Sequence, residues 1–243
     1  MIEIKGKWAL VTGASRGIGA LTAKFLAERG CNLVLQSRKN SHLDAVLAEV
    51  KHYGVETYAV ECQLEDDKDV KRMLKEIDDN GTNVEIVLNN AGVQVAYRPY
   101  PDYYETPSED FVYSLKVNTI APIIICYHYL PRMIENGFGR IVNTTSGIRL
   151  EPEQAAYSAS KAGLDKITQD LASKVDGTDV MLSLTDPGWC RTDLGGPMAP
   201  NAPESALPGV VLGVFADDKK SGRIIAAQDY AGMSLEQALT KLK

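Results

Sequence analysis

The chain has 243 residues, of which 44% are hydrophobic, and its 26 basic and 32 acidic side chains give a net charge of −6. This is enough for one large domain with a substantial core. The acidic balance argues against non-specific nucleic-acid binding, no apolar run reaches the roughly 18–20 residues of a membrane span, and the first residues contain no apolar signal region.

Strand-like and helix-like segments alternate along the chain, because short apolar runs predict buried strands and longer periodic stretches predict helices. In chain order the expected elements are a strand at 8–11, a helix from a glycine-rich turn to about residue 29, a strand at 32–35, a helix around 42–53, a strand at 55–60, a helix at about 66–79, a strand at 86–88, a long helix at about 108–135, a strand at 140–143, a helix at 155–174, a strand at 180–184, a short helix within 203–215, a strand at 223–226 and a short helix from residue 235. Pro122 and Pro131 are expected to perturb the long helix.

Continuous apolar strands that alternate with helices are typical of a parallel sheet covered on both faces. The predicted fold class is therefore α/β, with one doubly wound parallel sheet of about seven strands flanked by helices. No repeat or linker divides the chain, so a single domain is expected over residues 1–243. Ligands of such sheets bind beyond the carboxyl ends of the strands.

The four cysteines have no close pair among them, and the three histidines have no metal-ligand spacing. Neither a zinc site nor a disulfide framework is therefore expected. Cys31, Cys62 and Cys126 lie in or beside apolar segments and are expected to be core thiols. Buried free thiols fit a reducing compartment, so a cytoplasmic location is predicted.

A glycine-rich turn, Thr12–Gly19, follows the first strand. Gly13 would allow a tight exit from the strand, Gly17 would let a pyrophosphate approach the backbone, and Gly19 would let the next helix pack closely on the sheet. The helix N-terminus would then offer free N–H groups to an anion. The pattern favours a dinucleotide site over a turn that merely requires glycine.

Tyr157 and Lys161 lie four residues apart in a predicted helix and therefore on one face of it. A free phenol has a pKa of about 10, and a nearby ammonium group lowers it toward the neutral range. The pair is a candidate general acid/base. Such a spacing also occurs by chance on solvated helix faces, but the glycine-rich turn upstream favours the catalytic interpretation.

Six segments occur in the order that short-chain dehydrogenases/reductases use: Thr12–Gly19, Asn89–Gly92, Asn118, Ser146, Tyr157 with Lys161, and Pro187–Gly188. The chain resembles this family over about residues 5–195. The resemblance implies a Rossmann-type single domain, a nicotinamide cofactor and hydride transfer to or from a carbonyl carbon.

The resemblance also implies a role for each catalytic residue. Ser146 would donate a hydrogen bond to the substrate carbonyl oxygen, although Thr144 and Thr145 are neighbouring hydroxyls. Tyr157 would exchange the proton with that oxygen. Lys161 would lower the pKa of Tyr157 and bind the nicotinamide ribose. The backbone of Asn118 would hold a water in a proton relay. Residues expected to bind the cofactor are Gly13, Ser15, Arg16, Gly17, Ile18, Gly19, Ser37, Arg38, Gln63, Leu64, Asn90, Ala91, Gly92, Tyr157, Lys161, Pro187, Gly188 and Thr192.

Charge at the end of the second strand bears on the choice of cofactor. NAD enzymes usually place a carboxylate there, whereas this chain reads Gln-Ser-Arg-Lys at residues 36–39. Arg38, with Arg16 from the turn, could form ion pairs with a 2′-phosphate, and this predicts NADP(H) as the cofactor. The alternative is that both arginines are only solvated. At the end of the third strand Gln63 stands where the family usually has an Asp. Its side-chain carbonyl could accept the hydrogen bond from the adenine amino group that the Asp accepts.

Residues 147–154 and 189–207 are expected to shape the substrate pocket. Arg149 and Glu151 face either the pocket or solvent. The tyrosines of residues 97–104 form either a stacking wall for a substrate or a packing contact with a neighbouring loop or subunit. The glycine pair that often follows the family's last strand is missing, so a homo-dimer or homo-tetramer is expected to use the 108–135 and 155–174 helices.

The predicted function is that of a cytoplasmic NADP(H)-dependent oxidoreductase acting on a small carbonyl or alcohol substrate, most simply a ketone or aldehyde reductase. One alternative is an NAD(P)-dependent polyol or sugar dehydrogenase that works oxidatively. Another is a non-catalytic dinucleotide-sensing protein on the same fold, because a fold does not determine function. The complete set of Ser146, Tyr157 and Lys161 argues against this last alternative.

Overall fold

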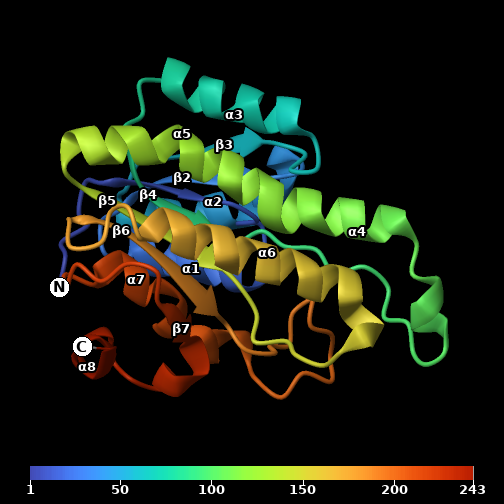
Figure 1. Ribbon diagram of the computed structural model, residues 1–243. Helices are drawn as coiled ribbons and strands as arrows, with labels where there is room; N and C mark the ends of the chain where they lie inside the picture. Colours follow the sequence, from blue (N-terminus) through green and yellow to red (C-terminus); the bar gives the residue numbers. More distant parts are fainter. Residues whose placement is uncertain (243) are drawn as a thin grey trace.

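A single seven-stranded parallel sheet runs through the molecule (Figure 1). The computed structural model describes residues 1–242, so Lys243, the last residue of the expected domain, lies outside it. Along the sheet the strand order is β3-β2-β1-β4-β5-β6-β7. The strands are β1 (Trp8–Val11), β2 (Asn32–Ser37), β3 (Thr57–Glu61), β4 (Val84–Asn89), β5 (Gly139–Thr144), β6 (Val180–Asp186) and β7 (Ile224–Ala226).

The order of the strands reverses beside β1, because β2 pairs with one of its edges and β4 with the other. Val11, the last residue of β1, is in register with Leu35 of β2 and Leu88 of β4. This is the switch point at which open α/β sheets bind ligands. The predicted α/β fold with about seven parallel strands is confirmed.

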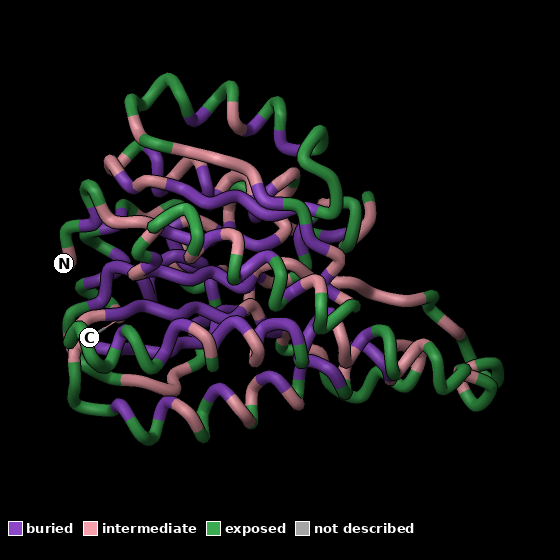
Figure 2. The backbone as a smooth tube through the Cα atoms, turned by 90° about the horizontal axis from the view of Figure 1, so that it is seen from above, coloured by how far each residue is buried: buried purple, intermediate pink, exposed green. Residues whose placement is uncertain are grey.

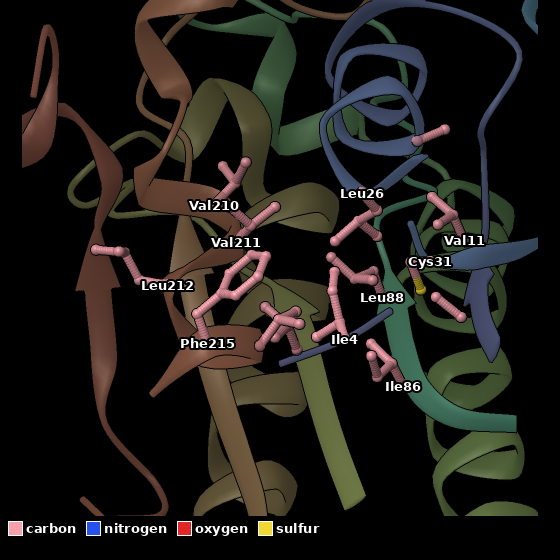
Figure 3. Packing of buried hydrophobic residues seen from close by; sticks show 14 of the residues in the cluster. Ile4, Val11, Leu26, Cys31, Ile86, Leu88, Val210, Val211, Leu212 and Phe215 are labelled. Carbon is pink, nitrogen blue, oxygen red and sulfur yellow. The ribbon is translucent and has the colours of Figure 1, made fainter. Parts of the chain in front are cut away.

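Helices cover both faces of the sheet: α1 (Gly17–Ala27), α2 (Asp44–Val50), α3 (Asp67–Asp79), α4 (Ser108–Leu115), α5 (Ala121–Asn136), α6 (Ala155–Ala172), α7 (Leu212–Phe215) and α8 (Leu235–Leu242). Side chains of α3 and α5 pack with Leu10 and Val34 in one hydrophobic core. Alternate strand residues such as Ala9 and Val11 point to the other face and pack with α1, α2, α7 and α8. Figure 3 shows part of this second core, where Leu26, Leu88 and Phe215 surround Ile4.

The long helix expected at 108–135 is interrupted. A π-helical segment, Lys116–Ile120, separates α4 from α5. Pro122, the second residue of α5, has no N–H to donate into the preceding turn, which is where the wider turn occurs. Pro131 lies inside α5. The interruption places Asn118 in the π segment.

Several element bounds differ from those expected. The third strand begins at Thr57 and β6 continues to Asp186 at the ligand edge of the sheet. The helix expected around 42–53 is α-helical only in α2, with 3-10 turns at both ends, and the segment 203–215 holds two 3-10 turns before α7. The short C-terminal helix from Leu235 is confirmed as α8.

The loop before α4 and the start of α4 project beyond the rest of the chain (Figures 1 and 2), and most of this projection is exposed. Within residues 1–242 no helix combines the length and the apolar composition that a bilayer crossing requires.

Candidate active site

A cavity of about 1340 Å³ lies beyond the carboxyl ends of the strands, as expected for this fold. The glycine-rich turn and the ends of β2, β4, β5 and β6 all contribute to its wall, together with α6 and residues 187–195. Most of the predicted site residues line it: Gly13, Ser15, Arg16, Gly17, Ile18, Ser37, Arg38, Leu64, Asn90, Ala91, Gly92, Ser146, Tyr157, Lys161, Pro187, Gly188 and Thr192. Gly19, Gln63 and Asn118 are the predicted site residues outside this lining.

Two glycines of the glycine-rich turn, Gly13 and Gly19, leave no room for a side chain. Gly13 has φ +63°, and a Cβ built on it would lie 2.8 Å from the Cα of Ala91. A Cβ on Gly19 would overlap the carbonyl oxygen of Gly13, so Gly19 acts beneath the cavity by letting α1 pack against the turn. The bare backbone and the N-terminus of α1 fit a bound pyrophosphate. This cradle is the feature that matches a dinucleotide.

Two amide side chains, one buried and one partly buried, hold the turn in place. Gln36, at 2% exposure, accepts a hydrogen bond from the Gly13 N–H at 3.0 Å through its Oε1 and donates through Nε2 to the Cys62 carbonyl at 2.8 Å. Asn90 Nδ2 donates to the Thr12 carbonyl at 3.0 Å. Gln36 is not among the predicted site residues. A polar residue inside an otherwise apolar strand was the signal that could have revealed it.

The end of β2 differs from expectation in its details. Arg38 is exposed and lines the cavity, as predicted. Gln63, expected to face adenine, instead donates through Nε2 to the Arg38 carbonyl at 2.8 Å and lies outside the lining. Arg16 forms an ion pair with Asp193, with 2.8 Å between Nε and Oδ2. His42 and Glu65, which were not predicted, also line this end of the cavity.

Residues 189–195 close over the turn. The methyl group of Thr192 lies 3.3 Å from the position that a Cβ of Gly17 would occupy. Trp189 Nε1 donates to the Gly195 carbonyl at 2.7 Å, and Arg191 donates to the Pro200 carbonyl at 2.7 Å. These bonds give the segment a defined shape against the cavity.

Ser146, Tyr157 and Lys161 meet at the other end of the cavity. Tyr157 and Lys161 are both on α6, and Ser146 follows β5. Lys161 Nζ donates to the Thr144 carbonyl at 2.7 Å and lies 5.7 Å from the centre of the Tyr157 ring. The predicted triad is therefore brought together at one place.

The electrostatics of the pair differ from expectation. Burial raises the pKa of Tyr157; a hydrogen bond with Ser146 opposes the rise and the charge of Asp186 adds to it, so that the pKa lies at about 12. Burial lowers the pKa of Lys161 to about 8, against the charges of Asp165 and Asp186. The expectation that Lys161 brings the Tyr157 pKa toward neutrality is wrong for this structure, because burial disfavours the phenolate and raises the Tyr157 pKa.

Asn118 is fully buried and fastens the wall of the cavity. Its Oδ1 accepts from the Val93 N–H at 2.8 Å, and its Nδ2 donates to the Val93 carbonyl at 2.8 Å and to Ser160 Oγ at 2.9 Å. The side chain thus ties the loop after β4 to α6. The water-holding role of its backbone stays a prediction.

Polar and aromatic side chains border the space beyond Ser146. Gln94 Nε2 donates to Gln154 Oε1 at 2.6 Å, and both residues line the cavity. Arg149 and Glu151 line it too, yet both are exposed, so each has access to the cavity and to solvent.

The tyrosine-rich loop divides into two parts. Tyr97 lines the cavity. Tyr100, Tyr103 and Tyr104 lie outside the lining and pack on one another, with 4.4 Å between the last two ring centres. A substrate wall is therefore possible only for Tyr97, and the other three form a packing cluster.

Comparisons with known proteins agree with this geometry. The family model described as short chain dehydrogenase matches residues 7–202. The chain is 28% identical to a 3-oxoacyl-[acyl-carrier-protein] reductase from Aquifex aeolicus, over 92% of this chain and 90% of that one. It is 33% identical to the human inactive hydroxysteroid dehydrogenase-like protein 1, over 81% of this chain but only 60% of that protein.

Solved structures include a metagenomic short-chain oxidoreductase in complex with NADP, with a TM-score of 0.79 and 28% identity over 93% of this chain and 98% of the other. An NAD⁺-bound xylitol dehydrogenase has a TM-score of 0.78 and 27% identity over the same shares, 93% and 98%. The family match covers the glycine-rich turn, the triad and the strands that hold them. This chain therefore belongs to the short-chain dehydrogenase family.

Proposed function

We propose that this protein is an NADP(H)-dependent reductase of ketones or aldehydes, with cofactor binding and catalysis combined in one domain. The observation that supports this most directly is a single cavity with the glycine cradle and Arg38 at one end and Ser146, Tyr157 and Lys161 at the other. A nicotinamide cofactor would supply the hydride, and the protein would supply orientation and the proton.

Each residue of the triad has a task in this proposal. Ser146 donates a hydrogen bond to the carbonyl oxygen and orients it. Tyr157 transfers its hydroxyl proton to that oxygen. Burial holds the Tyr157 pKa near 12, so the hydroxyl carries its proton at neutral pH but is a weaker acid than a free phenol. Lys161 provides the adjacent positive charge that stabilises the phenolate left behind.

The preference for NADP(H) is supported by Arg38, which faces the cavity where NAD enzymes usually carry a carboxylate. Arg16 is near the same site but forms an ion pair with Asp193, so a 2′-phosphate would compete with that carboxylate. Among similar structures one binds NADP and another binds NAD⁺, so the choice depends on these local residues.

Two alternatives have specific support. The polar pair Gln94–Gln154 beside the triad and the likeness to a xylitol dehydrogenase favour a polyol or sugar dehydrogenase. The likeness to a protein called inactive favours a non-catalytic dinucleotide-binding protein. The assembled triad is the argument for catalysis.

The proposal also covers the cellular compartment and the oligomeric state of the protein. All four cysteines are free and buried, which supports a reducing cytoplasm. Exposed apolar side chains on α4 and α5, among them Val112, Tyr127 and Ile134, support a homo-dimer or homo-tetramer. Light scattering of the purified protein would give the oligomeric state.

A panel of ketones and aldehydes assayed with NADPH and with NADH, and of polyols assayed with NADP⁺ and with NAD⁺, tests the proposal. We expect turnover of at least one carbonyl compound with a higher kcat/KM for NADPH. Cofactor binding measured by calorimetry without any turnover would support the non-catalytic alternative. Turnover confined to polyols with NAD⁺ would support the sugar dehydrogenase.

A further inference from the structure

Asp186, the last residue of β6, connects two loops of the active site. Its Oδ2 accepts a hydrogen bond from the Gly147 N–H at 2.9 Å, and its Oδ1 accepts one from the Gly188 N–H at 2.9 Å. Gly147 directly follows Ser146, and Gly188 belongs to the Pro-Gly turn that lines the cavity. Each carboxylate oxygen thus holds one of the two loops.

The fit between this carboxylate and the loop after Ser146 is close. A Cβ built on Gly147 would lie 2.8 Å from Asp186 Oδ2, which is shorter than real contacts allow. The loop therefore approaches the carboxylate with its bare backbone. A loop held by a charged acceptor has a fixed position, because bonds to ionised groups are roughly twice as strong as neutral ones.

Asp186 also places a negative charge beside the catalytic pair. Its charge acts on Tyr157, Lys161 and Asp165, which are all on α6, and on Cys190, whose neighbour Arg191 opposes it. Asp165 and Asp186 are the two carboxylates that raise the pKa of the fully buried Lys161 ammonium group, and Asp186 also raises the pKa of Tyr157.

We propose that Asp186 is a positioning residue of this active site: its carboxylate fixes the Ser146 loop against the Pro187–Gly188 turn and places a negative charge beside the catalytic pair, Tyr157 and Lys161. The inference rests on the proposed reductase function. It assigns a role to a carboxylate at a position where the family resemblance called only for the following Pro-Gly pair.

The sign of the expected pH effect is the same for both catalytic residues. Reduction needs the phenol as acid and the ammonium as neighbouring charge, and both protons are lost as the pH rises. Removing the negative charge of Asp186 lowers the pKa of Tyr157 and of Lys161 together. The loss of reductase activity on the alkaline side should therefore begin at a lower pH.

The test compares the pH dependence of kcat/KM for carbonyl reduction in four proteins. Asp186→Asn removes the charge and keeps one acceptor oxygen, whereas Asp186→Ala removes both the charge and the bridge. Asp170→Asn makes the same charge change at an exposed position of α6 and is the matched control. We expect the alkaline limb to move down by about one pH unit in both Asp186 variants and to stay unchanged in the control.

The bridging role has its own variant. Gly147→Ala displaces the loop from the carboxylate but keeps its charge. We expect at least a tenfold loss of kcat with a much smaller movement of the alkaline limb than in Asp186→Asn. This variant also keeps the proposal testable if the Asp186 variants do not fold, which circular dichroism would show.

A second measurement does not depend on turnover. Titration of ¹³C-labelled lysine Cε groups by NMR follows Lys161 in the protein without substrate, with its signal identified by its absence in Lys161→Met. We expect a lower Lys161 pKa in Asp186→Asn than in the wild type. An unchanged Lys161 pKa together with an unchanged alkaline limb would overturn the proposed charge role. An unchanged kcat in Asp186→Ala and Gly147→Ala would overturn the bridging role. If the wild type reduces no carbonyl compound, the proposed function fails, whereas the NMR result still decides the charge role.

Discussion

The buried charge of Lys161 should destabilise the folded protein more at neutral pH than at alkaline pH. Burial lowers its pKa from 10.5 to about 8 in the folded protein. Because the folded pKa lies below the unfolded one, the unfolded chain binds the proton more tightly. The destabilisation is fully present below pH 8 and is relieved as the pH rises from there toward 10.5.

The size of the effect follows from the same two pKa values. Linkage gives a cost of about 3 kcal/mol at pH 7 and about 1.4 kcal/mol at pH 9.5. Between these pH values the free energy of unfolding of the wild type should therefore rise by about 2 kcal/mol relative to Lys161→Met. The hydrogen bond to the Thr144 carbonyl largely cancels in this comparison, because a neutral amine can still donate it.

Urea denaturation of both proteins at pH 7 and pH 9.5 measures this double difference. Lys166→Met, which changes an exposed lysine on the same helix, is the control. Its free energy of unfolding should change between the two pH values by the same amount as that of the wild type. If the free energy of unfolding also changes equally between the two pH values in the wild type and in Lys161→Met, burial of the Lys161 charge does not destabilise the fold, and the reasoning is refuted.

Three further predictions concern the site. Tyr157→Phe should bind the cofactor normally but lower kcat by about 10²–10⁴-fold, and a variant that keeps more than a tenth of the wild-type kcat would show that Tyr157 is not the acid. Arg38→Ala should weaken NADPH binding by about 1.5–3 kcal/mol and leave NADH binding unchanged, with Lys39→Ala as control; equal losses for both cofactors would contradict a 2′-phosphate contact. Gln36→Leu should lower the free energy of unfolding by about 2 kcal/mol in urea, because the Gly13 N–H and the Cys62 carbonyl lose their partner, and an unchanged stability would mean that water replaces the amide.

Much of the fold was predictable because strand and helix periodicities are local properties. All seven strands follow from short apolar runs between helices, and their parallel order follows from the alternation. The π segment at Lys116–Ile120 was not predictable, since its only local signal is Pro122 and a proline at that place also fits an ordinary helix start.

In the site, sequence spacing predicted which residues lie close together but not their pKa values. Four-residue spacing places Tyr157 and Lys161 on one face of a helix whether or not the helix is buried. Their pKa values depend on burial and on Asp186, which comes from a strand 29 residues after Tyr157 and was not predictable as a neighbour. The hydrogen bond that Gln63 Nε2 donates to the Arg38 carbonyl was not predictable for a similar reason, because that carbonyl lies in the loop after another strand, and adenine contact by Gln63 stays a prediction.

The residues that break local rules in this chain gather around one cavity. A lysine is buried, a glutamine is buried near the end of a largely apolar strand, and glycines occupy the first turn of α1, where the Gly13 carbonyl leaves no room for a side chain at Gly19. Each choice is explained by a cofactor cradle or by a proton-transfer pair. Since consistent sequences break such rules mainly at functional sites, the clustering is an argument for catalysis that does not depend on any relative's activity.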